Sequence, residues 1–134
     1  MSEENEIYKA DQSFYDNVPW DKVANNKIEK EEYLRLKAKV KTSYVTFLGP
    51  PDSLSFYMFK PLSWGEYKVI REKRLDKDTT HEYIINNCVL YPKMDPIDIG
   101  ELDAGIMLTL VYQILTVSNF VDNKDSVLNM IYQS

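Results

Sequence analysis

The stretch SYVTFLGPPDSLSFYMFKPL, residues 43–62, decides the fold class of this chain. Its first six residues and the run at 54–59 are rich in β-branched and aromatic side chains, which favour strands. The turn residues GPPD at 49–52 separate the two runs, and Pro61 ends the second one. These features predict an antiparallel β-hairpin. Because an isolated hairpin is only marginally stable in water, it must pack on helices or extend the sheet of a neighbour.

Amphipathic helices are expected directly before and directly after this hairpin. Residues 28–41 place their apolar side chains on one stripe, which predicts a short helix. After the hairpin, Ser63 is followed three residues later by Glu66, the spacing of a capping box in which each side chain satisfies a free backbone amide. A second helix is therefore expected to begin near Ser63.

Three further helices are predicted in the rest of the chain. Thr79 and Glu82 repeat the capping-box spacing ahead of an apolar stripe that runs up to Tyr91, and residues 93–100 are expected to be a loop. The stretch AGIMLTLVYQILTVSNF at 104–120 is apolar around its circumference, so other elements must cover most of it. Residues 124–132 predict a final short helix. The expected fold is α+β, mainly α, with a small antiparallel hairpin and a compact bundle of three to five helices.

The first 28 residues are expected to form an extended N-terminal arm, followed by a single domain at 29–134. Large apolar side chains recur in the arm without the periodicity of a helix or a strand, and Pro19 disfavours a helix there. Such side chains need a surface, which is either the chain's own domain or a neighbouring subunit; a free tail is the third alternative. Deletion of residues 1–24 is expected to leave the domain folded but to weaken its association with a partner.

Composition and charge limit the classes of function that this chain can have. Its 134 residues carry a net charge of -5, and residues 95–134 account for all of it, with six acidic residues against Lys124. An acidic chain is not expected to bind nucleic acid, because binding phosphates requires a surplus of Lys and Arg. One cysteine excludes an internal disulfide, and one histidine leaves no structural zinc site. No apolar run is long enough to cross a membrane, and the polar start is unlike a secretory signal.

Residues that could carry catalysis are few. His81 and Cys88 lie two helical turns apart, which is too far for proton transfer, so His81 is expected at the surface in a first turn and Cys88 in the core. The acidic residues at 95–103 could bind a metal or act as paired carboxylates, but a calcium loop starting at Asp95 has Ile97 at its third position. Helix capping explains these acids more simply, with an acidic patch that faces a partner as the alternative. We expect a chain that is not an enzyme and needs no cofactor, with a metal-dependent hydrolase as a remote alternative.

Three stretches of this chain resemble phage tail and baseplate assembly chaperones. They are FKPLSWGEYKVI at 59–70, the helix end CVLYP at 88–92 and the apolar helix at 104–120, all within about residues 56–120. Met107 and Asn119 stand where proline and glycine are common in that family. The resemblance implies an assembly chaperone that shields the apolar helices of a tape-measure protein or assists formation of the baseplate hub. The alternative is a structural subunit that remains in the tail or baseplate of the virion.

The expected partners follow from this interpretation. They are tape-measure or hub proteins, with a homo-oligomer also possible and neither nucleic acid nor membrane involved. The expected location is the host cytoplasm during assembly, and the virion tail or baseplate for a retained subunit. The aromatic and apolar residues expected to contact a partner are Tyr8, Phe14, Tyr15, Trp20, Trp64, Tyr67, Tyr91, Ile106, Leu110 and Phe120.

Overall fold

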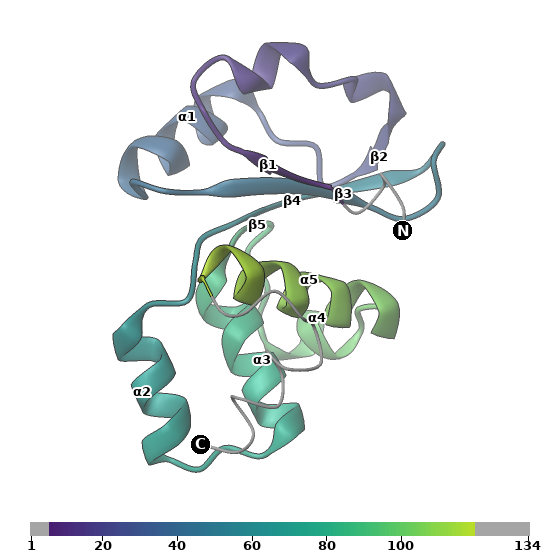
Figure 1. The fold of residues 1–134 in the computed structure, drawn as a ribbon. Coiled ribbons are helices and arrows are strands. Elements are labelled where there is room, and N and C mark those ends of the chain that lie inside the picture. Colours follow the sequence, from purple (N-terminus) through teal and green to yellow (C-terminus); the bar gives the residue numbers. More distant parts are fainter. Residues whose placement is uncertain (1–5, 120–134) are drawn as a thin grey trace. The chain divides into compact units, whose positions relative to one another are not determined.

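The fold is α+β, as predicted, and is divided into two compact units (Figure 1). The computed structural model describes residues 6–119. Unit 1 comprises Met1–Lys60 and Val89–Lys93, and unit 2 comprises Pro61–Cys88 and Met94–Ser134. The division therefore differs from the predicted one, in which an arm at 1–28 preceded a single domain.

The predicted hairpin is confirmed and lies at the centre of unit 1. Strand β3 (Tyr44–Leu48) pairs antiparallel with β4 (Leu54–Phe59), with Phe47 opposite Phe56. The turn between them requires Gly49, whose φ of 112° is rarely adopted by residues with a side chain. A Cβ atom at this position would also lie only 3.2 Å from the carbonyl oxygen of Ser53.

Three short strands extend this hairpin into a five-stranded sheet. Strand β1 (Ile7–Lys9) pairs antiparallel with β3, and β2 (Val23–Asn25) pairs parallel with the start of β4. Strand β5 (Val89–Tyr91) pairs antiparallel with the end of β4. The prediction that the preceding helix continues to Tyr91 is wrong, because that helix ends at Cys88 and the next residues join the sheet.

The N-terminal segment belongs to the core of unit 1. Between β1 and β2 it forms two short 3-10 helices, η2 (Phe14–Asn17) and η3 (Trp20–Lys22). The helix predicted at residues 28–41 is confirmed as α1 (Lys30–Lys39). Of the alternatives for the N-terminal aromatics, packing on the chain's own residues is observed. The buried residues of this core are Ala10, Val18, Val23, Ile28, Tyr33, Leu36, Val45, Phe56 and Met58.

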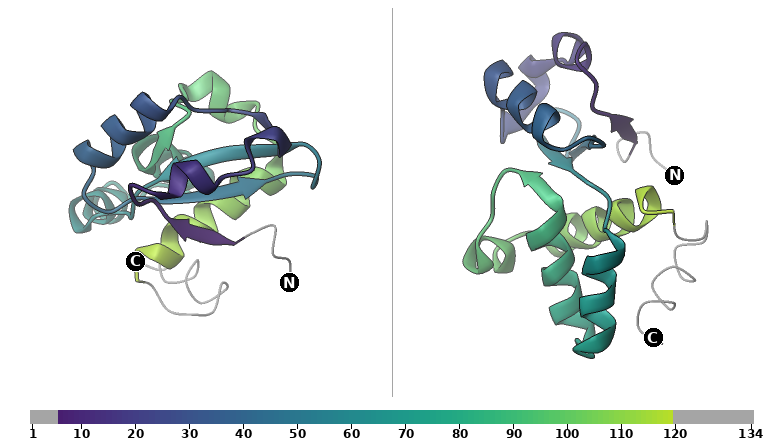
Figure 2. Two further views of the ribbon diagram at one scale, coloured as in Figure 1. Left: turned by 90° about the horizontal axis from the view of Figure 1, so that it is seen from above. Right: turned by 90° about the vertical axis from the view of Figure 1, so that its left-hand side faces the viewer.

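Unit 2 contains four helices within its described part: α2 (Trp64–Glu72), α3 (Lys77–Cys88), α4 (Pro96–Gly100) and α5 (Ala104–Val117). Helices α3 and α5 pack against each other, and α3 also contacts α4. Figures 1 and 2 show α3 lying between α2 and α4. The second half of α5 is largely buried, with Leu110, Val111, Gln113, Ile114 and Leu115 nearly inaccessible to solvent, whereas Leu108 remains 45% exposed.

The ends of these helices confirm some of the capping predictions and correct others. The capping box of Ser63 and Glu66 is present at the start of α2. The one predicted at Thr79 is wrong: α3 begins two residues earlier, and the carboxylate of Asp76 accepts a hydrogen bond of 2.8 Å from the Thr79 amide. The predicted loop at 93–100 contains α4, and the predicted helix at 124–132 lies outside the described residues.

No helix among residues 6–119 has both the length and the apolar character needed to span a membrane.

Candidate functional site

A groove with aromatic walls lies on the surface of unit 1. Three rings form its walls: Tyr8 from β1, Phe14 from η2 and Phe47 from β3. Their centroids are 5.6 Å apart for Tyr8 and Phe14, 6.0 Å for Tyr8 and Phe47, and 6.4 Å for Phe14 and Phe47. The groove has a volume of about 520 Å³ and opens to solvent on one side.

Strand register brings two of these rings together. Tyr8 stands opposite Val45 in the pairing of β1 with β3, so Tyr8, Val45 and Phe47 share one face of the sheet. Val45 is fully buried, while Tyr8 and Phe47 are half-buried. The face that packs against the core therefore continues into the wall of the groove.

The remaining lining is mostly apolar, with two polar residues. The apolar members are Val18, Pro19, Pro51 and Leu54, and the polar ones are Asn17 and Lys22. Among the described residues that line the groove, only Lys22 and Tyr8 are titratable, and none is a carboxylate or an imidazole. An apolar cavity with few polar groups is typical of a binding site for an apolar side chain or ligand.

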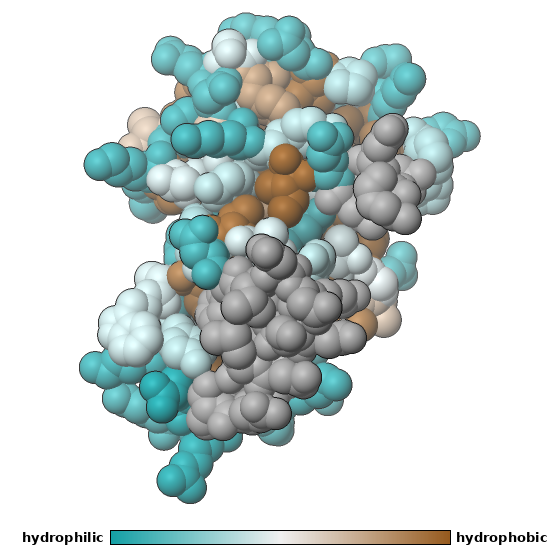
Figure 3. Space-filling model, viewed as in Figure 1, coloured by the Kyte–Doolittle hydropathy of each residue, from teal (hydrophilic) through white to brown (hydrophobic). Residues whose placement is uncertain are grey.

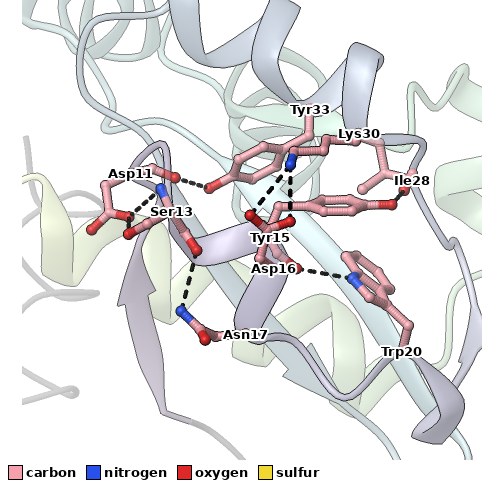
Figure 4. A network of polar contacts seen from close by, with 9 residues as sticks. All are labelled: Asp11, Ser13, Tyr15, Asp16, Asn17, Trp20, Ile28, Lys30 and Tyr33. Carbon is pink, nitrogen blue, oxygen red and sulfur yellow. Dashed lines mark hydrogen bonds and ion pairs between the residues drawn. The ribbon is translucent and has the colours of Figure 1, made fainter.

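A polar network behind the groove holds its N-terminal wall in place (Figure 4). The Tyr33 hydroxyl donates a hydrogen bond of 2.7 Å to the carbonyl oxygen of Asp11, and the Tyr15 hydroxyl donates one of 2.8 Å to the carbonyl oxygen of Ile28. The Trp20 indole nitrogen donates one of 3.1 Å to the carbonyl oxygen of Tyr15. The first two bonds link the segment 11–20 to α1 and to Ile28, which precedes α1. The third lies within the segment.

Burial shifts the ionisation of both tyrosines. It raises the pKa of Tyr33 to about 12, with a smaller contribution from the charge of Asp11. The pKa of Tyr15 is also raised, first by burial and then by the charge of Glu29. Both hydroxyls therefore remain protonated hydrogen-bond donors at neutral pH.

A second exposed aromatic surface lies on α2 in unit 2. Trp64, the first residue of the helix, is 66% exposed, and its ring centroid is 5.7 Å from that of Tyr67. The guanidinium carbon of Arg71 is 6.0 Å from the Tyr67 ring centroid, within reach of a cation–π interaction. Trp64, Lys68, Arg71 and Glu72 line a shallow depression of about 320 Å³. In Figure 3 the surface over α2 is pale and teal with little brown, as expected for aromatic and charged rather than aliphatic side chains.

The structure places the predicted contact residues in different environments. Tyr8 and Phe14 line the groove, whereas Tyr15 and Trp20 pack against the core of unit 1. Tyr91 also packs there, and its hydroxyl donates a hydrogen bond of 2.9 Å to the carbonyl oxygen of Lys27.

In unit 2 the predicted contact residues likewise differ in exposure. Trp64 and Tyr67 lie together on α2, and Ile106 is half-buried on α5. Leu110 is a fully buried residue of α5, so its side chain is not part of the surface. Phe120 lies outside the described residues.

Sequence reasoning missed Phe47, Lys22 and Ile97. Phe47 was assigned to a strand, but the partner strand that places it beside Tyr8 is distant in the sequence. Lys22 carries no local signal of a groove. Ile97 was assigned to a loop and is 71% exposed on α4.

Two of the four carboxylates considered for catalysis cap a helix, whereas Asp103 precedes α5 without a side-chain capping hydrogen bond. Asp95 and Asp98 form a capping box at the start of α4, in which each carboxylate accepts a hydrogen bond from the other's amide. Cys88 is buried, as predicted. The prediction that His81 is a surface residue is wrong, because it is 6% exposed and burial lowers its pKa. Among residues 6–119, no three His, Cys, Asp or Glu side chains are grouped so that they could hold a metal ion.

The chain matches no protein-family model, no curated protein and no solved structure.

Proposed function

We propose that this protein is a non-enzymatic, protein-binding component of bacteriophage tail or baseplate assembly, acting as a chaperone for tail or hub proteins. The observation that carries the binding role is the aromatic groove of unit 1, formed by Tyr8, Phe14 and Phe47. The biological setting rests on the sequence resemblance at about residues 56–120.

The size and lining of the groove favour an apolar segment of another protein as its occupant. A groove of about 520 Å³ accommodates a few side chains of a bound peptide. Aromatic rings supply a large contact area at a low cost in conformational entropy, which is why they are enriched in the centres of protein interfaces. An apolar helix of a tape-measure or hub protein has the side chains that this lining requires.

The fixed wall of the groove also supports a binding role. Hydrogen bonds from Tyr15, Trp20 and Tyr33 hold the segment that carries Phe14, so little ordering of this wall is needed when a partner binds. The polar groups at the groove, Asn17 and Lys22, suit hydrogen bonds to the backbone of a bound segment. Within residues 6–119, the lining of the groove offers no pair of groups suited to acid and base catalysis, which favours binding over a hydrolase.

Filling the groove tests this function. Asn17 is exposed, lines the groove and lies outside the core, so Asn17→Trp places an indole in the cavity without removing a core side chain. The purified full-length protein is titrated with purified phage tape-measure and hub proteins, and binding is measured by isothermal titration calorimetry. We expect Asn17→Trp to weaken binding about tenfold or more. The control, Asn17→Ala, should bind as the wild type does.

One result would contradict the role of the groove, and another separates the two versions of this proposal. Equal binding by the wild type and by Asn17→Trp would remove the groove as the binding site. Mass spectrometry of purified virions then separates a chaperone from a subunit: absence of the chain favours the chaperone, and its presence in a fixed stoichiometry favours the structural subunit.

A further inference from the structure

Unit 2 carries a basic aromatic surface on α2, the Trp64 surface. It consists of Trp64, Tyr67, Lys68 and Arg71 on α2, and it includes the depression of about 320 Å³ beside Trp64. Lys73 and Arg74 follow directly after the helix and are exposed. Within residues 6–119, Lys68, Arg71, Lys73 and Arg74 form no ion pair. This surface therefore presents an exposed indole beside four cations and the Glu72 carboxylate, which forms no ion pair with them within residues 6–119.

A surface of complementary chemistry lies on α4 of the same unit. Ile97 is 71% exposed, the highest value among the large hydrophobic side chains of residues 6–119, and it belongs to a helix of five residues. Asp95, Asp98, Glu101 and Asp103 surround it in the sequence, and no cation occurs between residues 95 and 103. The capping box of Asp95 and Asp98 fixes the backbone that presents Ile97. This surface, the Ile97 corner, is thus an exposed apolar side chain among carboxylates.

The two surfaces of one chain cannot contact each other. Figure 1 and the right view of Figure 2 show α3 between α2 and α4, and α3 packs against α4. Because both surfaces belong to unit 2, their separation is a property of that unit alone. Any contact between them must join two molecules.

We infer that the Trp64 surface of one molecule binds the Ile97 corner of a second copy of this chain. Ile97 enters the depression beside Trp64, and the carboxylates around it face Lys68 and Arg71. Burial of the two most exposed large apolar side chains stabilises the contact, while the opposite charges fix its orientation and exclude the pairing of like surfaces. The surface that binds differs from the surface that is bound, so the contact is head-to-tail and generates a ring or an open chain of copies.

The association is expected to be weak and sensitive to salt. One indole and one isoleucine provide a small apolar centre, typical of transient interfaces that bury less than about 1,200 Å². Exposed charge pairs are screened at distances beyond about 8 Å at physiological ionic strength, so added salt should weaken the contact. Self-association uses other residues than the groove, and the two activities are separable.

Sedimentation velocity of the full-length protein tests this inference. We expect the average mass to rise with protein concentration at low salt and to fall when salt is added. Trp64→Ala and Ile97→Ser should each weaken association about tenfold or more. Leu108→Ser is the matched control, because Leu108 is also exposed and belongs to neither surface, so this variant should associate as the wild type does. Circular dichroism establishes that each variant is folded.

A mixture of two variants gives the most specific outcome. Trp64→Ala retains an intact Ile97 corner, and Ile97→Ser retains an intact Trp64 surface, so an equimolar mixture should form a dimer that cannot grow further. A wild type that stays monomeric at all concentrations, or a mixture that forms no dimer, overturns the inference. Binding of a foreign acidic protein by a monomeric wild type would likewise overturn it. Asn17→Trp should self-associate normally, which keeps failure of this inference distinct from failure of the proposed function.

Discussion

The hydroxyl of Tyr33 on α1 donates a hydrogen bond of 2.7 Å to the backbone carbonyl oxygen of Asp11, 22 residues earlier in the chain. The Tyr33 side chain is fully buried, and its ring lies 5.6 Å from that of Tyr15. This contact joins α1 to the turn that follows β1. It therefore holds in place the segment that supplies one wall of the groove.

Removal of this hydroxyl should destabilise the fold. Tyr33→Phe preserves the ring packing but leaves the Asp11 carbonyl oxygen without its donor, and we expect a loss of about 1 kcal/mol in the free energy of unfolding. Chemical denaturation measures this loss. Tyr44→Phe is the matched control, because the Tyr44 hydroxyl forms no hydrogen bond within residues 6–119, and it should change stability little. Equal effects of the two substitutions would contradict the assigned role of the hydrogen bond.

The raised pKa of Tyr33 predicts a loss of stability at alkaline pH. Burial, with the charge of Asp11, raises this pKa to about 12 from the ordinary value of 10.0. The unfolded chain therefore releases its proton at a lower pH than the folded chain does. The stabilisation is fully present below pH 10 and is lost as the pH rises from 10 towards 12. Melting temperatures over this range should fall more steeply for the wild type than for Tyr33→Phe, and parallel curves would argue against the shift.

The lowered pKa of His81 predicts a separate loss of stability at mildly acidic pH. Burial lowers this pKa below the ordinary value of 6.5, and the charge of Lys77 adds to the effect while Asp78 opposes it. The unfolded chain takes up a proton near pH 6.5, whereas folded His81 takes it up only at lower pH, so stability falls as the pH drops through this interval. His81→Gln removes the titrating group. The melting temperature of His81→Gln should decline less than that of the wild type between pH 7 and 5.5. An equal decline in the two proteins would mean that carboxylates, and not His81, cause the loss of stability.

Deletion of residues 1–24 should unfold unit 1, contrary to the expectation for a detachable arm. The deletion removes β1, the buried side chains of Val18 and Val23, and the aromatic packing of Phe14 on the core. We expect amides of β3 and β4 to lose protection in hydrogen exchange measured by mass spectrometry, because β3 then becomes an edge strand with an uncovered apolar face. Protection equal to that of the full chain would mean that the segment is dispensable for folding.

Part of the candidate site could be predicted from the sequence. The aromatic surplus of the first 28 residues indicated side chains in need of a surface, and Tyr8 and Phe14 do line the groove. Trp64 follows an N-cap serine at a predicted helix start, which places it in the first turn, where it is exposed. Phe47 could not be assigned to the groove, because its position beside Tyr8 depends on pairing between strands nearly 40 residues apart.

The predictions that failed share a physical cause. Strand β5 has three residues, and no local pattern separates its start from the end of α3. His81 is polar and near a helix start, which locally favours exposure, yet the packing of unit 2 buries it. In both cases contacts between distant segments override the local preference.

The sequence by itself determined the features whose energies are local: the hairpin with its turn at Gly49, the capping box of Ser63 and Glu66, and the apolar helix α5. Each depends on backbone conformation or on hydrogen bonds between residues a few positions apart. Only the tertiary structure decided that the N-terminal segment joins the sheet and that Tyr8 meets Phe47. Strands of three residues gain most of their stability from cross-strand pairing and from the core beneath them, and these partners lie far away in the chain.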